Sequence, residues 1–232
     1  MSKKKCHELF YGIACNADQE KFKQAILSDE NQVVIAEATA GAGKTLIAVA
    51  CAGQLVAHGV YDGLVYVFPT VEENSLGFRP GDTQMKESDY LEPLYDALTT
   101  IGEIPSRVIS SDITEKNGTA WVVARSATFM RGINLERKVL IVDECQNMTV
   151  PLIKRIISRA HDDCKVIVCG CLAQTDIPVS KSGFKQLIDH MEDYEGCVKC
   201  ELPISYRGRA SGILGSSFYL SAKLKILPLA VY

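Results

Sequence analysis

Residues 38–45 read A-T-A-G-A-G-K-T, and their types and spacing point to phosphate chemistry. A run of strand composition, residues 33–35, precedes them, and an apolar helical run, residues 46–50, follows them. A loop of small residues between a strand and a helix start leaves backbone N–H groups unpaired at the positive end of the helix dipole. In this context the pattern predicts a phosphate-binding loop.

Two side chains of this loop fit a nucleoside triphosphate with its magnesium ion. Lys44 would reach the β- and γ-phosphates, and the Thr45 hydroxyl would ligate Mg²⁺. Ala38 stands where the strict pattern has its first glycine, but the two conformationally demanding positions nearer the phosphates remain glycine. We expect the phosphates to be held by Thr39, Ala40, Gly41, Ala42, Gly43, Lys44, Thr45 and Leu46.

A second candidate group is the acidic pair Asp143-Glu144, which follows the apolar run 139–142. Asp143 would hold Mg²⁺ through water, and Glu144 would orient and polarise the water that attacks the γ-phosphate in line. A strand followed by an acidic helix start would be the better interpretation of the pair alone. The phosphate loop about one hundred residues earlier favours catalysis. We expect the two groups to face each other across adjoining strand ends.

Length and composition suit one domain with an ordinary core. The 232 residues are 47% hydrophobic and 23% charged, and a net charge of −3 argues against a broadly basic nucleic-acid surface while allowing a local basic channel. No apolar stretch is long enough to span a bilayer. The nine cysteines are an odd number without a loop framework, so we expect reduced thiols in a cytoplasmic protein that does not bind membranes.

Strand-like and helical segments alternate along the chain. Strands are predicted at 33–35, 64–68, 121–124, 139–142 and 166–169, and helices at 18–27, 46–58, 90–101, 151–160 and 184–191, with a Gly/Pro-rich insertion at 76–82. This alternation predicts an α/β fold, a mostly parallel sheet with helices on both faces. Without a visible linker or repeat, we expect a single domain over 1–232.

A family resemblance adds to these predictions. The segment 139–149, V-L-I-V-D-E-C-Q-N-M-T, resembles the Asp-Glu-Ala-Gln-Asn-x-Thr stretch of the PhoH family, single-domain ATPases whose core looks like the first motor domain of superfamily 1 helicases. Segments 77–82, 90–98 and 129–132 resemble further family segments in the same order. The resemblance runs from about residue 16 to residue 209. It implies a RecA-like P-loop NTPase fold and magnesium-dependent hydrolysis of ATP.

The resemblance also suggests roles for two glutamines. Gln174 lies in a segment that resembles a Gly-Asp-x-x-Gln motif and would sense the γ-phosphate, although Cys171 replaces the motif's Asp. Gln19, in an N-terminal segment of about residues 1–30, resembles the glutamine that reads adenine, since a carboxamide can donate to N7 and accept from N6. Asn16 would cap the helix that follows it.

Arginines would complete the site. Residues 202–208 resemble the Leu-x-x-Asn-Tyr-Arg-Ser segment of superfamily 1 helicases, which makes Arg207 the first candidate for the γ-phosphate, with Arg209 in reserve within the C-terminal segment and tail 203–232. Arg131 is a third candidate, equally suited to nucleic acid or the next subunit. One motor domain supplies only one wall of a helicase site. The resemblance therefore implies a head-to-tail ring, expected to be a hexamer, acting on RNA or single-stranded nucleic acid.

Other interpretations remain open from the sequence. A thymidine kinase also pairs a phosphate loop with an Asp-Glu-x-Gln segment, and a nucleotide-dependent switch would need no motor activity. Cys169, Cys171, Cys197 and Cys200 have zinc-like spacing, but apolar surroundings favour structural thiols. The phosphate loop begins at Ala38, so we expect no PIN-type nuclease domain before it, and the short chain suggests a bacteriophage-type member.

Overall fold

A computed structural model describes residues 10–69, 83–191 and 193–207, with only the backbone described for 83–89. The strands are β1 (Val33–Ala38), β2 (Leu64–Phe68), β3 (Val122–Ser126), β4 (Val139–Val142), β5 (Lys165–Gly170) and β6 (Cys197–Leu202). The α-helices are α2 (Ala17–Leu27), α3 (Lys44–Ala57), α4 (Thr83–Thr100), α5 (Pro105–Val108), α6 (Asp112–Lys116), α7 (Val150–Ile157) and α8 (Phe184–Met191). Short 3₁₀ turns are η1 (Phe10–Gly12), η2 (Ala127–Phe129), η3 (Cys145–Asn147) and η4 (Val179–Lys181). The insertion predicted at 76–82 lies outside the described residues.

The six strands form one sheet in the order β3-β2-β4-β5-β1-β6, and every neighbouring pair is parallel. All residues of β2, β4 and β5 are buried, as expected for β-branched and apolar strands that are covered on both faces. The predicted α/β fold with a parallel sheet is confirmed. Because all strands run the same way, their carboxyl ends meet at one edge, where ligand sites form in such sheets.

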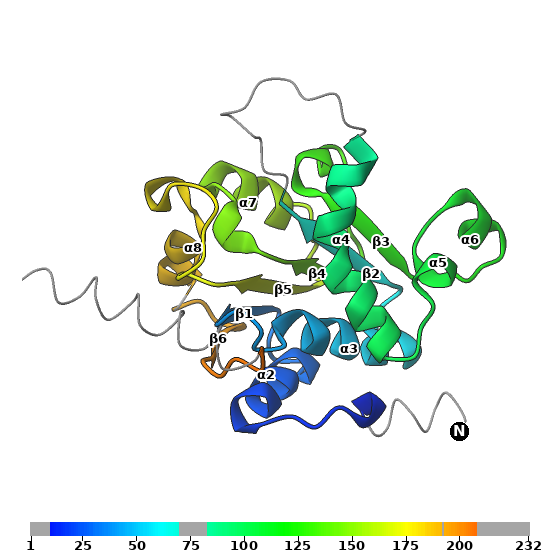
Figure 1. Ribbon diagram of the computed structural model, residues 1–232, viewed down its shortest axis with the longest axis horizontal. Helices are drawn as coiled ribbons and strands as arrows, with labels where there is room; N and C mark the ends of the chain where they lie inside the picture. The colour runs from blue at the N-terminus through cyan, green and yellow to red at the C-terminus, as the bar shows by residue number, and fades with distance from the viewer. Residues whose placement is uncertain (1–9, 70–82, 192, 208–232) are drawn as a thin grey trace, which may run out of the picture.

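Helices cover both faces of the sheet (Figure 1). α2, α3 and α4 pack one core against one face, and its largest buried side chains include Phe22, Ile47 and Leu98. α7 and α8 pack a second core against the opposite face, with Ile156 and Phe184 fully buried. Among the described residues, no helix is both long enough and apolar enough to cross a lipid bilayer.

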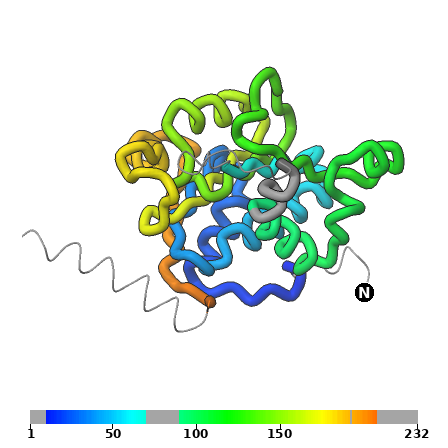
Figure 2. The backbone as a smooth tube through the Cα atoms, turned by 45° about the horizontal axis from the view of Figure 1, so that its top comes forward, coloured from blue at the N-terminus to red at the C-terminus, as the bar shows by residue number. Residues whose placement is uncertain are grey.

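Two parts of the fold were not predicted. The sequence pattern does not predict β6, because Lys199 and Glu201 interrupt its apolar residues. Such charged residues suit an edge strand that is only half buried. It pairs with β1 from Val33 to Ala38 and so returns the chain to the phosphate loop. The short helices α5 and α6 stand out from the body in both views (Figure 1 and Figure 2).

The strand order corrects one expectation. β1, which leads into the phosphate loop, and β4, which ends at the acidic pair, are not neighbours, because β5 lies between them. Sequence patterns locate strands but do not give their order in a sheet. The side chains nevertheless meet, since Lys44 Nζ lies 2.6 Å from Glu144 Oε1.

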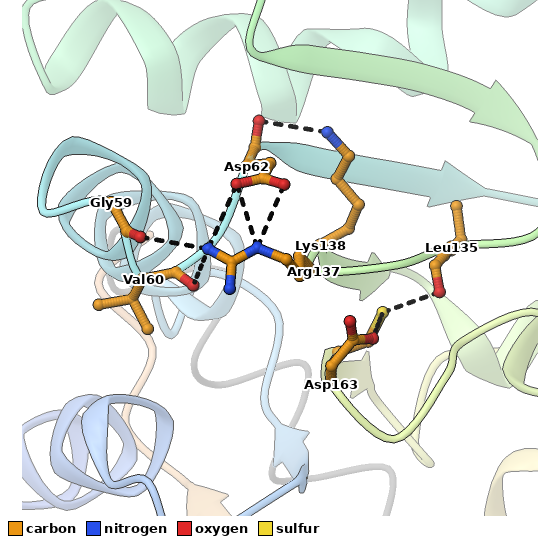
Figure 3. A network of polar contacts seen from close by, with 8 residues as sticks. Gly59, Val60, Asp62, Leu135, Arg137, Lys138 and Asp163 are labelled. Carbon is orange, nitrogen blue, oxygen red and sulfur yellow. Dashed lines mark hydrogen bonds and ion pairs between the residues drawn. The ribbon is translucent and has the colours of Figure 1, made fainter.

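The amino ends of the strands are joined by an exposed polar network (Figure 3). Arg137 has a left-handed backbone with a φ of 50° and directs its guanidinium to both carboxylate oxygens of Asp62, with Nε 3.3 Å from Oδ2. The same guanidinium donates to the carbonyls of Gly59 and Val60 just after α3. Lys138 Nζ donates to the Asp62 carbonyl at 3.2 Å. The network fastens the end of α3 to the segment that enters β4.

Candidate functional site

The phosphate loop joins β1 to α3 through two left-handed glycines. Gly41 has a φ of 75° and Gly43 has a φ of 81°. Residues other than glycine rarely adopt this left-handed backbone conformation. α3 begins at Lys44, and Gly43 at its N-cap position offers no side-chain acceptor to the first N–H groups. Those donors remain available at the positive end of a long helix, which is the arrangement that binds phosphate.

Asp143 is fully buried at the end of β4, and both of its carboxylate oxygens accept hydrogen bonds. Oδ2 accepts from Thr45 Oγ1 at 2.7 Å and from the Tyr66 hydroxyl at 2.8 Å, and Oδ1 accepts from the Glu144 N–H at 2.9 Å. Burial, and then the Asp143 charge, raises the pKa of Tyr66, so the phenol stays a donor. A hydroxyl beside a carboxylate is a donor set that suits Mg²⁺. Thr45 would ligate Mg²⁺ directly, and Asp143 would act through water.

Lys44 and Glu144 form an ion pair that is largely shielded from solvent, with their side chains 11% and 34% exposed. Burial alone would lower the pKa of Lys44, but the charges of Asp143 and Glu144 outweigh it and raise the pKa. Burial alone would raise the pKa of Glu144, but the charge and hydrogen bond of Lys44, the hydrogen bond from Gln146 and the charge of Arg207 together outweigh it. The pKa of Glu144 therefore lies below its usual value. Both groups are therefore ionised at neutral pH.

Glu144 is held in an unusual backbone conformation, and Gln146 fixes its side chain. Its φ of 50° is left-handed, which costs about 1 kcal/mol or more for a residue other than glycine. Gln146, 2% exposed, donates from Nε2 to Glu144 Oε2 at 2.5 Å and accepts from the Cys171 N–H at 3.0 Å. This one carboxamide connects the acidic pair to the loop after β5.

Gln174 lies in that loop on an exposed surface, and its N–H donates to the Cys171 carbonyl at 3.2 Å. The loop is fastened to η3 beyond Glu144, because Asn147 Nδ2 donates to Asp176 Oδ2 and the Asp176 N–H donates back to Asn147 Oδ1, both at 2.8 Å. Gln174 is thus at the same edge of the sheet as the acidic pair. Its role as a γ-phosphate sensor stays a prediction.

The segment after β6 runs beside the phosphate loop and brings Arg207 to it. The Thr39 N–H donates to the Leu202 carbonyl and the Tyr206 N–H donates to the Gly41 carbonyl, both at 2.9 Å. A Cβ added to Gly41 would lie 2.6 Å from Arg207 Cγ. Arg207 therefore lies against the phosphate loop of its own chain, although its predicted contact with a γ-phosphate is not tested by this geometry.

The N-terminal segment contacts the segment that follows β6. Figure 2 shows the blue and orange parts of the chain side by side. Asn16 Nδ2 donates to the Tyr206 hydroxyl at 2.7 Å, and Asn16 also caps α2 as predicted. Gln19 is 8% exposed; its Oε1 accepts from the Asn16 N–H and its Nε2 donates to the Ala42 carbonyl at 2.9 Å. This carboxamide supports the phosphate loop, while adenine recognition by Gln19 stays a prediction.

The positions of the other two arginine candidates, Arg131 and Arg209, do not indicate what they contact. Arg131 is exposed on the loop that follows η2, at the carboxyl edge of the sheet. Arg209 lies outside the described residues.

A zinc site was the alternative interpretation of the cysteines. Within the described ranges, no group of three or more His, Cys, Asp or Glu residues is placed to hold a metal ion, and Cys169 and Cys171 are buried.

Two site residues were missed by sequence reasoning. Tyr66 sits in an apolar strand, and the only available signal was that a buried phenol needs a hydrogen-bond partner. Gln146 lies within the acidic segment 139–149, but its position in the sequence does not indicate a role. Both act on carboxylates, Tyr66 on Asp143 and Gln146 on Glu144.

A pocket of about 300 Å³ opens beside the phosphate loop. One wall is the start of α3 with Lys44, Thr45 and Leu46, and the wall formed by α4 includes Pro93 and Asp96. The remaining lining residues are Gly41, Gly43, Ala97, Thr100, Tyr206 and Arg207. The pocket therefore extends from the phosphate loop towards α4, which leaves room for a group attached to the phosphates.

Comparison with known proteins assigns the sequence to a family. The family model described as PhoH-like protein matches residues 13–207. A PhoH-like protein of Synechocystis sp. is 35% identical over 79% of this chain and 54% of its own length. Protein PhoH of Escherichia coli K12 is 30% identical over 79% of this chain and 51% of its own length. The chain thus spans about half the length of these relatives.

A solved structure supports the fold at much lower identity. The DUF1998 helicase MrfA bound to DNA matches 87% of this chain and 29% of its own, with a TM-score of 0.50 and 13% sequence identity. At that identity the match shows the fold alone, an α/β core built on a parallel sheet.

Proposed function

The chain belongs to the PhoH-like protein family, and from that premise we propose that it binds ATP with Mg²⁺ and hydrolyses it. The observation that carries the proposal is the meeting of the two groups predicted from separate motifs. Lys44 contacts Glu144 and Thr45 contacts Asp143, although about one hundred residues separate the motifs. A lysine, a magnesium-binding hydroxyl and two carboxylates at a helix N-terminus are the parts needed for phosphoryl transfer to water.

In the proposed mechanism each residue has one task. Backbone N–H groups at the start of α3 hold the phosphates, and Lys44 turns from Glu144 to their β- and γ-oxygens. Thr45 and Asp143 would hold Mg²⁺, which neutralises the developing phosphate charge. Glu144, released from Lys44 but still held by Gln146, orients and polarises the attacking water. Arg207, already beside Gly41, supplies positive charge to the γ-phosphate.

The direct test is Mg²⁺-dependent ATP turnover by the wild type and Lys44→Ala. We expect the variant to lose measurable turnover, because it lacks the cation that contacts the transferred phosphate. Lys185→Ala is the matched control, since this lysine is 68% exposed on α8. Equal turnover by Lys44→Ala and the wild type would contradict the phosphate-loop assignment.

We further propose that the ATPase works as a head-to-tail homo-oligomer, a hexameric ring, on RNA or single-stranded nucleic acid. The open pocket beside the exposed Tyr206 and Arg207 supports this, because a neighbouring subunit could cover it. In such a ring Arg131 is available to the next subunit or to nucleic acid. Measuring the size of the protein in solution with and without ATP tests the oligomer, and an isolated monomer with full activity would contradict it.

Measuring ATP turnover with and without single-stranded RNA tests the motor activity. An unchanged rate would count against coupling of ATP hydrolysis to RNA.

A further inference from the structure

We propose that Asp96 of α4 recognises the ribose hydroxyls of the nucleotide, so that the site selects ribonucleotides over deoxyribonucleotides. The inference rests on the proposed ATP site and adds a substrate-selecting residue to it. The pocket extends from the phosphate loop between the start of α3, with Lys44, Thr45 and Leu46, and the α4 wall.

The position of the phosphates fixes where the nucleoside must lie. With the β- and γ-phosphates at Lys44 and Thr45, the α-phosphate follows towards Leu46 at the start of α3. The ribose attached to it then enters the part of the pocket between Leu46 and the α4 residues. Leu94, Ala97 and Leu98 are buried in the core that α4 shares with α3, so this wall is a firmly packed surface.

On this wall Asp96 offers a hydrogen-bond acceptor for the hydroxyl groups of a sugar. Its side chain is exposed and lines the pocket, and within the described residues its carboxylate has no hydrogen-bond or ion-pair partner. The neighbouring Thr100 hydroxyl donates to the Asp96 backbone carbonyl at 2.7 Å instead. An ionised carboxylate accepts hydrogen bonds only, so it repels phosphate and suits a pair of hydroxyl donors.

The other polar groups near the pocket do not serve the ribose. Lys44 is paired with Glu144 and is cationic, and Gln19 is bonded to the Ala42 carbonyl behind the phosphate loop. Pro93 and Ala97 offer only apolar surface on the α4 wall. Among the described residues that line the pocket, Asp96 is the one carboxylate, and we assign the 2′- and 3′-hydroxyls to it.

The experiment measures binding of Mg²⁺ with ATP, 2′-deoxy-ATP or 3′-deoxy-ATP to the full chain by calorimetry. For the wild type we expect each deoxy analogue to bind about tenfold more weakly than ATP, because a hydrogen bond to a charged acceptor is lost. Asp96→Ala should bind all three nucleotides with nearly the same affinity, and Asp96→Asn should restore part of the preference. Glu92→Ala is the matched control, an exposed acid on the same helix outside the pocket lining.

The outcomes separate this inference from the proposed function. A wild type that binds ATP and the deoxy analogues equally, or an Asp96→Ala variant that keeps the wild-type preference, would overturn the role of Asp96 and leave the ATP site intact. Failure of the wild type to bind any of the three nucleotides would overturn the ATP site and this inference together. Circular dichroism of each variant establishes that the comparison is made on folded protein.

Discussion

An ion pair that includes a residue with left-handed backbone lies at each end of the parallel strands. The carboxyl ends form what we call the carboxyl edge of the sheet, and the amino ends form the amino edge. At the carboxyl edge Glu144 is left-handed, with a φ of 50°, and pairs with Lys44 at 2.6 Å. At the amino edge Arg137 has the same φ and pairs with Asp62 at 3.3 Å. The first pair is largely shielded, whereas the second has side chains 54% and 56% exposed. Left-handed backbone is thus shared, and burial together with the phosphate loop distinguishes the proposed active edge from the structural one.

The largest effect is expected for Glu144→Gln at the carboxyl edge. The variant keeps the shape of the side chain and its bond with Gln146 but loses the charge that polarises water. We expect the turnover number to fall by about 10²–10⁴-fold while ATP remains bound. Single-turnover hydrolysis with a separate binding measurement checks this. A variant that no longer binds ATP would give Glu144 a structural or metal-binding role.

A comparison of two left-handed glycines comes next. Gly41, with a φ of 75°, faces Arg207, whereas Gly59, with a φ of 74°, has open space where a Cβ would go. We expect Gly59→Ala to cost about 1 kcal/mol of stability through backbone strain alone and to leave ATP affinity unchanged. Gly41→Ala should add a loss of about tenfold in ATP affinity, because Arg207 must move. Thermal unfolding and ATP titration check both, and equal affinities would show that the Arg207 contact is dispensable.

Tyr66→Phe removes a single hydroxyl from behind the carboxyl edge. Asp143 would keep its bond from Thr45 but lose a donor in a buried place, which should lower stability by about 1–2 kcal/mol. We also expect a several-fold rise in the Mg²⁺ concentration that half-saturates ATP turnover. Tyr95→Phe, at an exposed position of α4, is the control. An unchanged Mg²⁺ requirement would limit Tyr66 to a structural role.

The pH dependence of stability should also distinguish the edges. The pKa of Glu144 lies below its usual 4.5 when folded, so its pair with Lys44 stabilises the fold above about pH 4.5 and loses that contribution as the pH falls through the folded value. The free energy of unfolding of the wild type should therefore approach that of Glu144→Gln on acidification, by no more than about 1 kcal/mol. Urea titrations at several pH values check this. A constant difference between the two proteins would contradict the assigned ionisation.

The smallest effect is expected for Arg137→Ala at the amino edge. Its ion pair with Asp62 is exposed and screened by solvent, so the loss of stability should stay within about 1 kcal/mol. ATP affinity and turnover should not change, because the network lies at the opposite ends of the strands. Chemical denaturation and turnover measurements check the two statements. A marked loss of turnover would show that the two edges are coupled through β4.

The sequence by itself determined the phosphate loop, the acidic pair, five of the six strands and the α/β class. These features are local: small residues at a helix start and unbroken apolar runs leave few alternatives for the backbone. Tertiary structure alone decided that β5 separates β1 from β4 and that β6 returns to the loop. It also decided that Tyr66 contacts Asp143 and that Arg207 lies against Gly41. Strand order and side-chain contacts arise from packing between distant segments, and no local pattern in the chain encodes them.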